Sequence, residues 1–437
     1  MKSFRHLVFT WTALLLWAGA AQAELTIQIT GGTEGALPIA VVPFHFEGAG
    51  TPPHDVAEII RSDLARSGRF APQNTERLPA RPYEANQVDY SVWRSRNIDN
   101  LVVGRIQAAP GGGYQVRFQL LDVYRGTQLA GYSISASAEN LRRIAHQISD
   151  IVYQTLLGER GAFDTHIAYV TVTKAADGEK TYRLAIADSD GHNEQIIYES
   201  TQPVMSPAWS PDGQRLAYVS FSRGRPEIYI QNLASGQSER ISDFPGLNGA
   251  PIWSPDGGRL ALTLSKDGSA NVYLMDVASR KLTQITDSYA IDTEPAWLPD
   301  GRSLIFTSDR GGRPQLYRVA VGPRGASGAP RRITFEGNYN AGAAVSPDGS
   351  RVAMVHSDGG GFRIAVQDLE KGDFQVLTDT RLDESPSFAP NGSMIIYATQ
   401  TGGSGVLSVV SVDGRAHHKL ALQRGDVREP TWSPFRN

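Results

Sequence analysis

The sequence is 437 residues long, with 41% hydrophobic and 20% charged residues and a formal net charge of −3. This balance is typical of a globular protein with a large core, and it lacks the basic excess that neutralises phosphates, so no nucleic-acid partner is expected. The 44 glycines and 25 prolines are spread along the chain, which favours many short strands joined by tight turns.

Residues 1–23 have the pattern of a secretory signal peptide. A short basic region precedes an apolar run at 7–21, and cleavage is predicted between Ala23 and Glu24. An uncleaved membrane anchor is the alternative, but the run is short for a membrane span. The sequence contains no cysteine, which excludes a lipid-anchored N-terminus and disulfides. We therefore expect a soluble protein of the periplasm without a transmembrane segment.

Residues 24–37 are predicted to form an N-terminal arm. After Glu24, the apolar residues Leu25, Ile27 and Ile29 alternate with polar ones, and a glycine-rich stretch follows them. This pattern is compatible with an edge strand and with a mobile arm on a glycine hinge.

A small α/β domain is predicted over residues 38–158. Its elements are expected in the order strand, helix, short helix, three strands and long helix, over residues 38–44, 54–67, 89–96, 101–107, 114–123, 128–136 and 141–156. The last helix carries an apolar stripe that we expect to pack on the strands, and Gly158 is its candidate C-cap. Residues 159–165 are expected to be a linker.

Beyond the linker one motif recurs. SPAWSPDG at 206–213 is followed by APIWSPDG, EPAWLPDG, AAVSPDG, SPSFAPNG and EPTWSPF, and their prolines, from Pro211 to Pro434, are 44, 44, 48, 43 and 44 residues apart. An insertion at 322–330 explains the long interval. Three more strand-like runs follow each of the first five copies, and Asp-Gly or Asn-Gly suits the tight turn after the first strand. This period predicts a β-propeller.

Six blades are expected over residues 166–437. Residues 166–200 supply the second, third and fourth strands of a blade, but no motif strand precedes them. The last copy, at 429–434, is a first strand with nothing after it. The C-terminal strand is therefore expected to complete the blade that begins at His166 and to close the ring, which removes exposed sheet edges. The predicted fold class is an α/β N-terminal domain plus an all-β six-bladed propeller.

No catalytic constellation is visible in the sequence. There is no G-x-S-x-G elbow, no cysteine nucleophile, and no histidine spacing typical of a metal site. The stretch from Asp188 to Gly191 is faintly similar to a calcium loop, but it lacks the remaining ligands, so a hairpin turn is favoured. The sequence predicts no catalytic residue, metal or cofactor.

The residues just before each motif strand are the candidate binding site, because the first strand of a blade lines the channel. They are expected to ring one mouth and to bring five carboxylates together, partly offset by an arginine. Solvated turns are the alternative interpretation. A partner with a complementary basic or amide-rich surface is expected. The candidate residues are Asn248, Ala250, Thr293, Glu294, Asn340, Asp383, Glu384, Arg428 and Glu429.

The whole mature chain resembles the TolB family of the Tol-Pal system. The resemblance rests on the domain order and on three segments: PIAVVPF at 38–44, FPGLNGAP at 244–251 and DTEPAW at 292–297. It implies a periplasmic, non-enzymatic adaptor that supports outer-membrane integrity and constriction during cell division. The implied partners are the lipoprotein Pal at the propeller mouth, TolA through the N-terminal arm, and colicins in some members.

Carried over by position, the resemblance ties Ala250 and Thr293 to lipoprotein binding, with Asn248 and Glu294 beside them. The loop before Asn248 departs from the family, because Leu247 stands where relatives often carry a basic residue. The arm is expected to order against the domain interface in one state and to be released in another. Two other functions stay open: a propeller hydrolase or lyase acting on cell-wall or sugar substrates, and a small-molecule or metal sensor.

Overall fold

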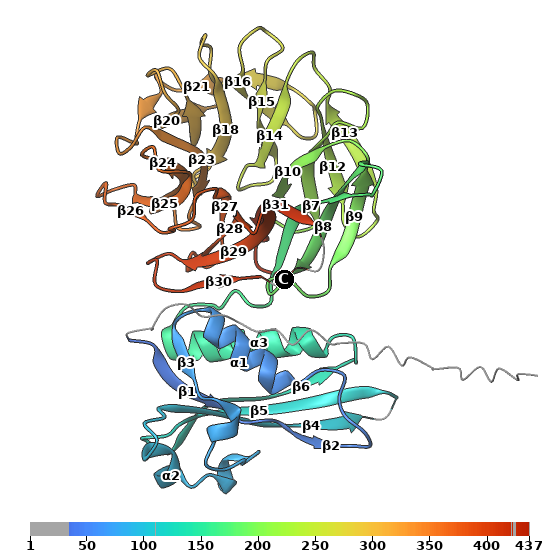
Figure 1. The fold of residues 1–437 in the computed structure, drawn as a ribbon, viewed down its shortest axis with the longest axis vertical. Coiled ribbons are helices and arrows are strands. Elements are labelled where there is room, and N and C mark those ends of the chain that lie inside the picture. The colour runs from blue at the N-terminus through green and yellow to red at the C-terminus, as the bar shows by residue number, and fades with distance from the viewer. Residues whose placement is uncertain (1–34, 110, 421, 423–424, 437) are drawn as a thin grey trace, which may run out of the picture.

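The alternation of turns and short apolar runs produces two sheet-rich parts, an N-terminal α/β domain and a β-propeller (Figure 1). The computed structural model describes residues 35–109, 111–420, 422 and 425–436. The predicted signal peptide and residues 24–34 of the predicted arm lie outside the described residues. No helix within the described ranges is long and apolar enough to cross a bilayer.

The N-terminal domain contains one mixed sheet, in the strand order β3-β1-β4-β5-β6, with β2 also paired to β4. Strands β1, β2 and β3 run parallel to their partners, whereas β4, β5 and β6 form an antiparallel meander. The strands are β1 (Leu37–Val41), β2 (His45–Glu47), β3 (Phe70–Pro72), β4 (Asn100–Ala109), β5 (Gly113–Asp122) and β6 (Thr127–Ala136).

The two long helices, α1 (Val56–Arg66) and α3 (Leu141–Leu157), cover one face of this sheet (Figure 1). The Asp55 side chain caps α1 by accepting a hydrogen bond from the backbone of the third residue of the helix. Helix α3 ends at Gly158, whose φ of 80° is the left-handed cap expected there. The short helix α2 (Tyr90–Arg94) covers the other face. The apolar stripe of α3 therefore packs on the strands, as predicted.

The propeller consists of six sheets, and its inner strands β10, β14, β18, β23, β27 and β31 lie around the centre of the ring (Figure 1). Blades 1 to 3 comprise β10 (Val204–Trp209), β11 (Arg215–Ser220), β12 (Glu227–Asn232) and β13 (Ser238–Ser242); β14 (Asn248–Trp253), β15 (Arg259–Leu264), β16 (Asn271–Asp276) and β17 (Leu282–Gln284); and β18 (Asp292–Trp297), β19 (Ser303–Ser308), β20 (Gln315–Gly322) and β22 (Arg331–Arg332).

Blades 4 and 5 follow the same pattern, and blade 6 closes the ring as predicted. They comprise β23 (Tyr339–Val345), β24 (Arg351–Ser357), β25 (Arg363–Asp368) and β26 (Phe374–Val376); β27 (Glu384–Phe388), β28 (Met394–Thr401), β29 (Ser404–Ser411) and β30 (His417–Lys419); and β31 (Asp426–Trp432), β7 (His166–Lys174), β8 (Lys180–Asp188) and β9 (Gln195–Ser200). The insertion at 322–330 contains a small extra strand, β21 (Gly325–Ala326), paired to β20.

The recurring motif forms both the turn and the joint between blades. In its first copy the Ser210 hydroxyl donates to Asp212 and accepts from the backbone N–H of Arg215, which fixes the turn after the inner strand. The tryptophans reach the preceding blade: Trp253 donates through Nε1 to the carbonyl of Ala208 at 3.2 Å, and the Arg215 guanidinium lies over the Trp253 ring. The serine–aspartate turn is repeated in blades 2 and 4, whereas Val345 and Phe388 replace the tryptophan in blades 4 and 5.

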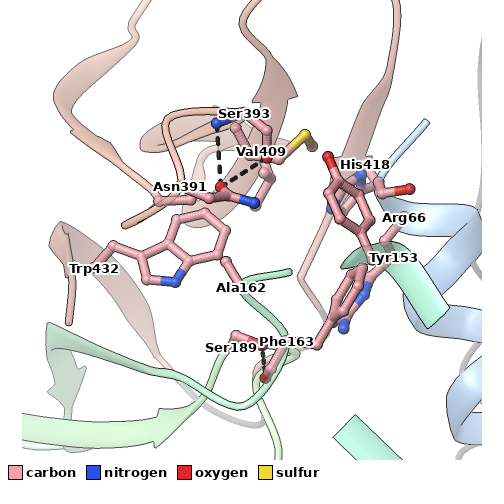
Figure 2. A pocket seen from close by; sticks show the side chains of 13 residues that line it. Arg66, Tyr153, Ala162, Phe163, Ser189, Asn391, Ser393, Val409, His418 and Trp432 are labelled. Carbon is pink, nitrogen blue, oxygen red and sulfur yellow. Dashed lines mark hydrogen bonds between the residues drawn. The ribbon is translucent and has the colours of Figure 1, made fainter. Parts of the chain in front are cut away.

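The N-terminal domain sits on the end of the propeller that carries the motif turns of blades 4 and 5. Figure 2 shows a mainly apolar pocket at this interface, with Tyr153 of α3 beside Arg66 and His418, and Trp432 of the last inner strand on the far side. The opposite end of the channel faces away from the N-terminal domain. We call that end the mouth.

Candidate binding surface at the channel mouth

A β-bulge interrupts every inner strand close to the mouth. At each bulge one residue adopts a positive φ, between 47° and 62°. A bulge bends the strand and redirects a side chain, so these six positions determine which groups face the channel. They are Ser206, Ala250, Glu294, Gly342, Ser385 and Glu429.

The bulges show which residues occupy equivalent positions in the six inner strands. The sequence predicted that these residues precede the motif strand, but Ala250, Glu294 and Glu429 lie within the inner strands, at the bulge. In blades 4 and 5 the predicted residues end before the bulge, at Asn340 and Glu384. The prediction also omitted blade 1, where Ser206 is the equivalent residue. A usable signal is present in five blades: the bulged residue is the one that precedes the first proline of the motif.

Two glutamates at the bulges join neighbouring blades through their carboxylates. Glu294 Oε2 accepts from the backbone N–H of Gly342 at 2.9 Å and from the Thr307 hydroxyl at 2.9 Å. Glu429 Oε2 accepts from the backbone N–H of Ser206, which links the last inner strand of the chain to the first. Charged acceptors make such bonds strong, so both side chains are held in place at the channel wall.

A hollow opens at the mouth, and part of the predicted set lines it. Five of the nine predicted residues line it: Glu294, Asp383, Glu384, Arg428 and Glu429. Burial raises the pKa of Glu429 to about 7, with the charges of Glu384 and Glu294 adding to the effect. The hollow is therefore acidic, and its negative charge increases as the pH rises through neutrality, because Glu429 loses its proton.

The predicted residues at the loop ends have another role, because they are buried and paired with the connection to the preceding blade or with that blade itself. Asn248 accepts from the backbone N–H of Phe244 at 3.0 Å and donates to the carbonyl of the same residue at 2.7 Å. Asn340 donates to Gln315 of the preceding blade, and Asp383 accepts from Thr380 at 2.6 Å. These side chains hold the mouth loops in shape, which is a positioning role.

The remaining predicted residues lie beside the bulges. Thr293 is half-buried and receives a long hydrogen bond of 3.4 Å from the Thr263 hydroxyl. Arg428 is exposed, with its guanidinium 3.8 Å from the carboxylate of Asp426. The cleavage site at Ala23 and the arm residues lie outside the described ranges: Glu24, Leu25, Ile27 and Ile29. Among the described residues, no cluster of metal-ligand groups lies at the mouth.

Sequence reasoning missed a set of exposed apolar side chains around the hollow. Phe335 is 72% exposed, and Tyr289 is fully exposed. All lie in loops at the mouth end of blades 2 to 5, and Phe362 and Leu382 line the hollow itself; we call the set the apolar rim. Its members are Leu247, Tyr289, Ile291, Phe335, Phe362 and Leu382. Large apolar groups left in water around a polar hollow are typical of a protein-binding surface.

Comparison with known families matches both parts of the chain. Residues 25–129 match the model of the TolB amino-terminal domain, and residues 153–436 match that of the TolB beta propeller domain. The chain is 56% identical to the Tol-Pal system protein TolB of Nitrosococcus oceani, over 97% of each sequence. It is 56% identical to the protein of that name from Thioalkalivibrio sulfidiphilus, over 99% of this chain and 98% of the relative.

The fold agrees with a solved structure of the same family. The crystal structure of TolB from Acinetobacter baumannii superposes with a TM-score of 0.86 and 41% sequence identity, and it covers 94% of this chain and 99% of the other. The agreement extends over the α/β domain and the propeller together. By sequence and by fold, the chain belongs to the TolB family of Tol-Pal system proteins.

Proposed function

We propose that this protein is a non-enzymatic adaptor of the periplasm that binds the lipoprotein Pal at its channel mouth and TolA through its N-terminal arm. In this role it supports outer-membrane integrity and constriction during cell division, and colicins are further candidate ligands of the mouth. The observation that carries the proposal is the apolar rim around an acidic hollow at the free end of the propeller. Apolar anchors within a polar surround are what a protein partner recognises.

The charge of the hollow supports a partner of complementary chemistry. Glu294 and Glu429 are fixed by hydrogen bonds, so their carboxylates stand ready without loss of side-chain entropy on binding. Membership of the TolB family supports a partner from the Tol-Pal system. The pattern expected of a secreted protein, with cleavage after Ala23, supports the periplasm as the compartment.

Affinity for purified Pal tests the mouth. The double variant Tyr289→Ala/Phe335→Ala removes two anchors of the apolar rim, and Thr293→Arg/Glu294→Lys places positive charge at the bulge. Each should weaken binding by at least about tenfold in calorimetry, because a buried aromatic anchor contributes about 2 kcal/mol. Tyr132→Ala is the matched control, since this tyrosine is exposed on the N-terminal domain. Unchanged affinity of both mouth variants would refute the assignment.

Deletion of residues 24–33 tests the arm. We expect the shortened protein to lose TolA binding and to keep Pal binding, because the deletion ends before the described fold begins at residue 35. Loss of both activities would mean that the domain has misfolded, which circular dichroism would detect. Retention of TolA binding by a folded protein would refute the role of the arm.

A further inference from the structure

A buried cluster of charged side chains joins the N-terminal domain to the propeller, at the end opposite the mouth. Helix α1 contributes Asp63 and Arg66, helix α3 contributes Arg142 and His146, and the turn between β8 and β9 contributes Asp190. All five are at most 8% exposed. Charged residues are rarely buried so completely unless they are paired, so this cluster is a specific feature of the interface.

His146 lies between the carboxylates of the two domains. Its Nδ1 is 2.8 Å from Oδ2 of Asp63, which belongs to the same domain. Its Nε2 is 3.7 Å from Oδ2 of Asp190, which belongs to the propeller. Within the described residues Nε2 has no hydrogen-bond partner. The imidazole therefore bridges the interface with one nitrogen tied to its own domain and the other directed at the propeller.

The other charges of the cluster cancel in pairs. Arg66 pairs with Asp63, and Arg142 pairs with Asp190. With both carboxylates paired in this way, a proton on His146 adds a positive charge between Asp63 and Asp190. The Ser149 hydroxyl also donates to Asp63, at 2.7 Å, which satisfies the carboxylate further.

Other titratable groups face the cluster from each packed element. His192 follows Asp190 in the turn, and its Nδ1 lies 3.3 Å from the Asp190 carboxylate, with the side chain 39% exposed. His54 precedes α1 and is half-buried near Arg142 and His192. Asp150 on α3 adds a negative charge near Asp63. His418 of β30 is also buried at the interface beside Arg66, but burial and the charge of Arg66 lower its pKa to about 3, so it stays neutral.

We propose that His146 is a proton-operated lock between the two domains: its imidazolium holds Asp63 of the N-terminal domain to Asp190 of the propeller, and its deprotonation loosens the interface. A mainly apolar pocket lies beside the cluster at the same interface (Figure 2). The chain thus carries a pH-dependent control of how its domains are held together.

The electrostatics of the cluster give the direction of the effect. Burial lowers the pKa of His146, but the charges of Asp63 and Asp190 outweigh burial and leave the pKa above its ordinary value. The stabilisation is then complete below the unfolded pKa of about 6.5 and is lost as the pH rises through the higher folded pKa. Burial opposes ionisation of Asp190, yet His192, His146 and the arginines hold its pKa well below the usual range, so it remains an acceptor throughout.

Distance measurements between the domains test the lock in the full mature chain. Because the sequence has no cysteine, spin labels can be placed on Glu76→Cys in the N-terminal domain and Lys371→Cys in the propeller, both exposed. From pH 5.5 to 8.5 we expect a single narrow distance at low pH and a second, broader population at high pH. Over the whole titration, the ratio of loosened to docked protein changes tenfold for each unit by which the pKa of His146 is higher in the docked than in the loosened protein.

Three variants make the test specific. His146→Gln should remove the pH response, whereas His192→Gln should keep it, because His192 is partly exposed on the edge of the cluster. If His146→Gln fails to fold, Asp190→Asn should move the midpoint to lower pH by removing the charge of the propeller partner. The titration of His146, followed by NMR, should have the same midpoint as the distance change.

Three results would overturn the proposal. The distances could remain constant while His146 titrates, or His146→Gln could keep the wild-type response. His146 could also show no titration between pH 5.5 and 8.5. Each would mean that the proton on this side chain does not control the interface.

Discussion

Five residues other than glycine hold a positive φ at the mouth of the channel, at the same bulge in different blades. For a residue with a Cβ this conformation costs about 1–2 kcal/mol. Strain that recurs around one opening is maintained by the hydrogen bonds of the surrounding strands, and it aims the side chains of Glu294 and Glu429 along the channel wall. Blade 4 avoids the strain because it has Gly342 at this position.

Replacing Ala250 by glycine tests this strain. The left-handed conformation costs alanine about 1–2 kcal/mol, and the greater freedom of glycine in the unfolded chain offsets about 0.4–1 kcal/mol of the relief. We expect Ala250→Gly to be neutral or to raise the free energy of unfolding by up to about 1 kcal/mol in urea titrations. Ala261→Gly, in the buried strand β15 of the same blade, should instead lower it by about 1 kcal/mol or more. Equal losses in both variants would contradict the strain argument.

Because Glu429 titrates near neutrality, we expect the affinity for the partner at the mouth to depend on pH. Its pKa of about 7 means that the carboxylate ionises between pH 6 and 8. If the partner presents a basic surface, affinity should rise several-fold over this range, and Glu429→Gln should remove most of the rise while still accepting the Ser206 hydrogen bond. Calorimetry with Pal at pH 6, 7 and 8 measures this. Glu239→Gln, on the outer strand β13, is the control and should behave as wild type.

At the scale of the element, the C-terminal strand β31 determines whether the propeller closes. It pairs with β7, and Val427, Trp432 and Phe435 pack in the core shared by blades 5 and 6. A chain that ends at residue 425 should therefore lose the cooperative thermal transition of the propeller in calorimetry. Ser433→Ala, which removes the bond from the His166 N–H to the Ser433 hydroxyl and that from the hydroxyl to the Pro434 carbonyl, should cost only about 1–2 kcal/mol. Cooperative melting of the truncated chain near the wild-type temperature would show that closure is dispensable.

The repeated elements were predictable from sequence, and the surface they carry was only partly so. The inner strands and their turns were recognisable because each blade repeats the Pro, Trp and Asp-Gly signals. The bulge register of blades 4 and 5 was not recognised: blade 4 has Ala343 in place of the proline, and in blade 5 Ser385 was taken as part of the strand. The apolar rim was missed because its members lie in loops without periodicity, such as Tyr289 and Phe335.

At the scale of the whole molecule, the domain interface could not be predicted from sequence. Asp63, His146 and Asp190 come from three elements far apart in the chain, and no local pattern links them. The stretch Asp188 to Gly191 was expected to be a hairpin turn, and it is the turn between β8 and β9. That this turn also supplies a buried carboxylate to the interface depends on how the domains dock, which only the assembled structure reveals.

Because Asp150 is protonated more readily in the folded protein, we expect the free energy of unfolding to fall as the pH rises in the acid range. Its half-buried carboxylate accepts from the backbone N–H groups of Phe163 at 2.8 Å and Asp164 at 3.1 Å, which fixes the linker to α3. Burial, opposed by these bonds, raises its pKa from 3.8 to about 6. The stabilisation linked to its proton is complete below about pH 3.8 and is lost as the pH rises through about 6, an effect of up to about 3 kcal/mol.

Asp150→Asn should remove this dependence, because its side chain no longer titrates, although its single amide oxygen accepts from only one of the two linker N–H groups. Urea unfolding at pH 4.5 and 7 measures the difference, which should be smaller in Asp150→Asn than in wild type. Asp177→Asn is the matched control, since this carboxylate lies in an exposed turn of blade 6 and caps only its own backbone. The pH dependence of stability that remains in Asp150→Asn then comes from the other groups. His146 is one of them, because its proton also stabilises the folded state at lower pH. An unchanged pH dependence in Asp150→Asn would show that the linker carboxylate is not the group that titrates.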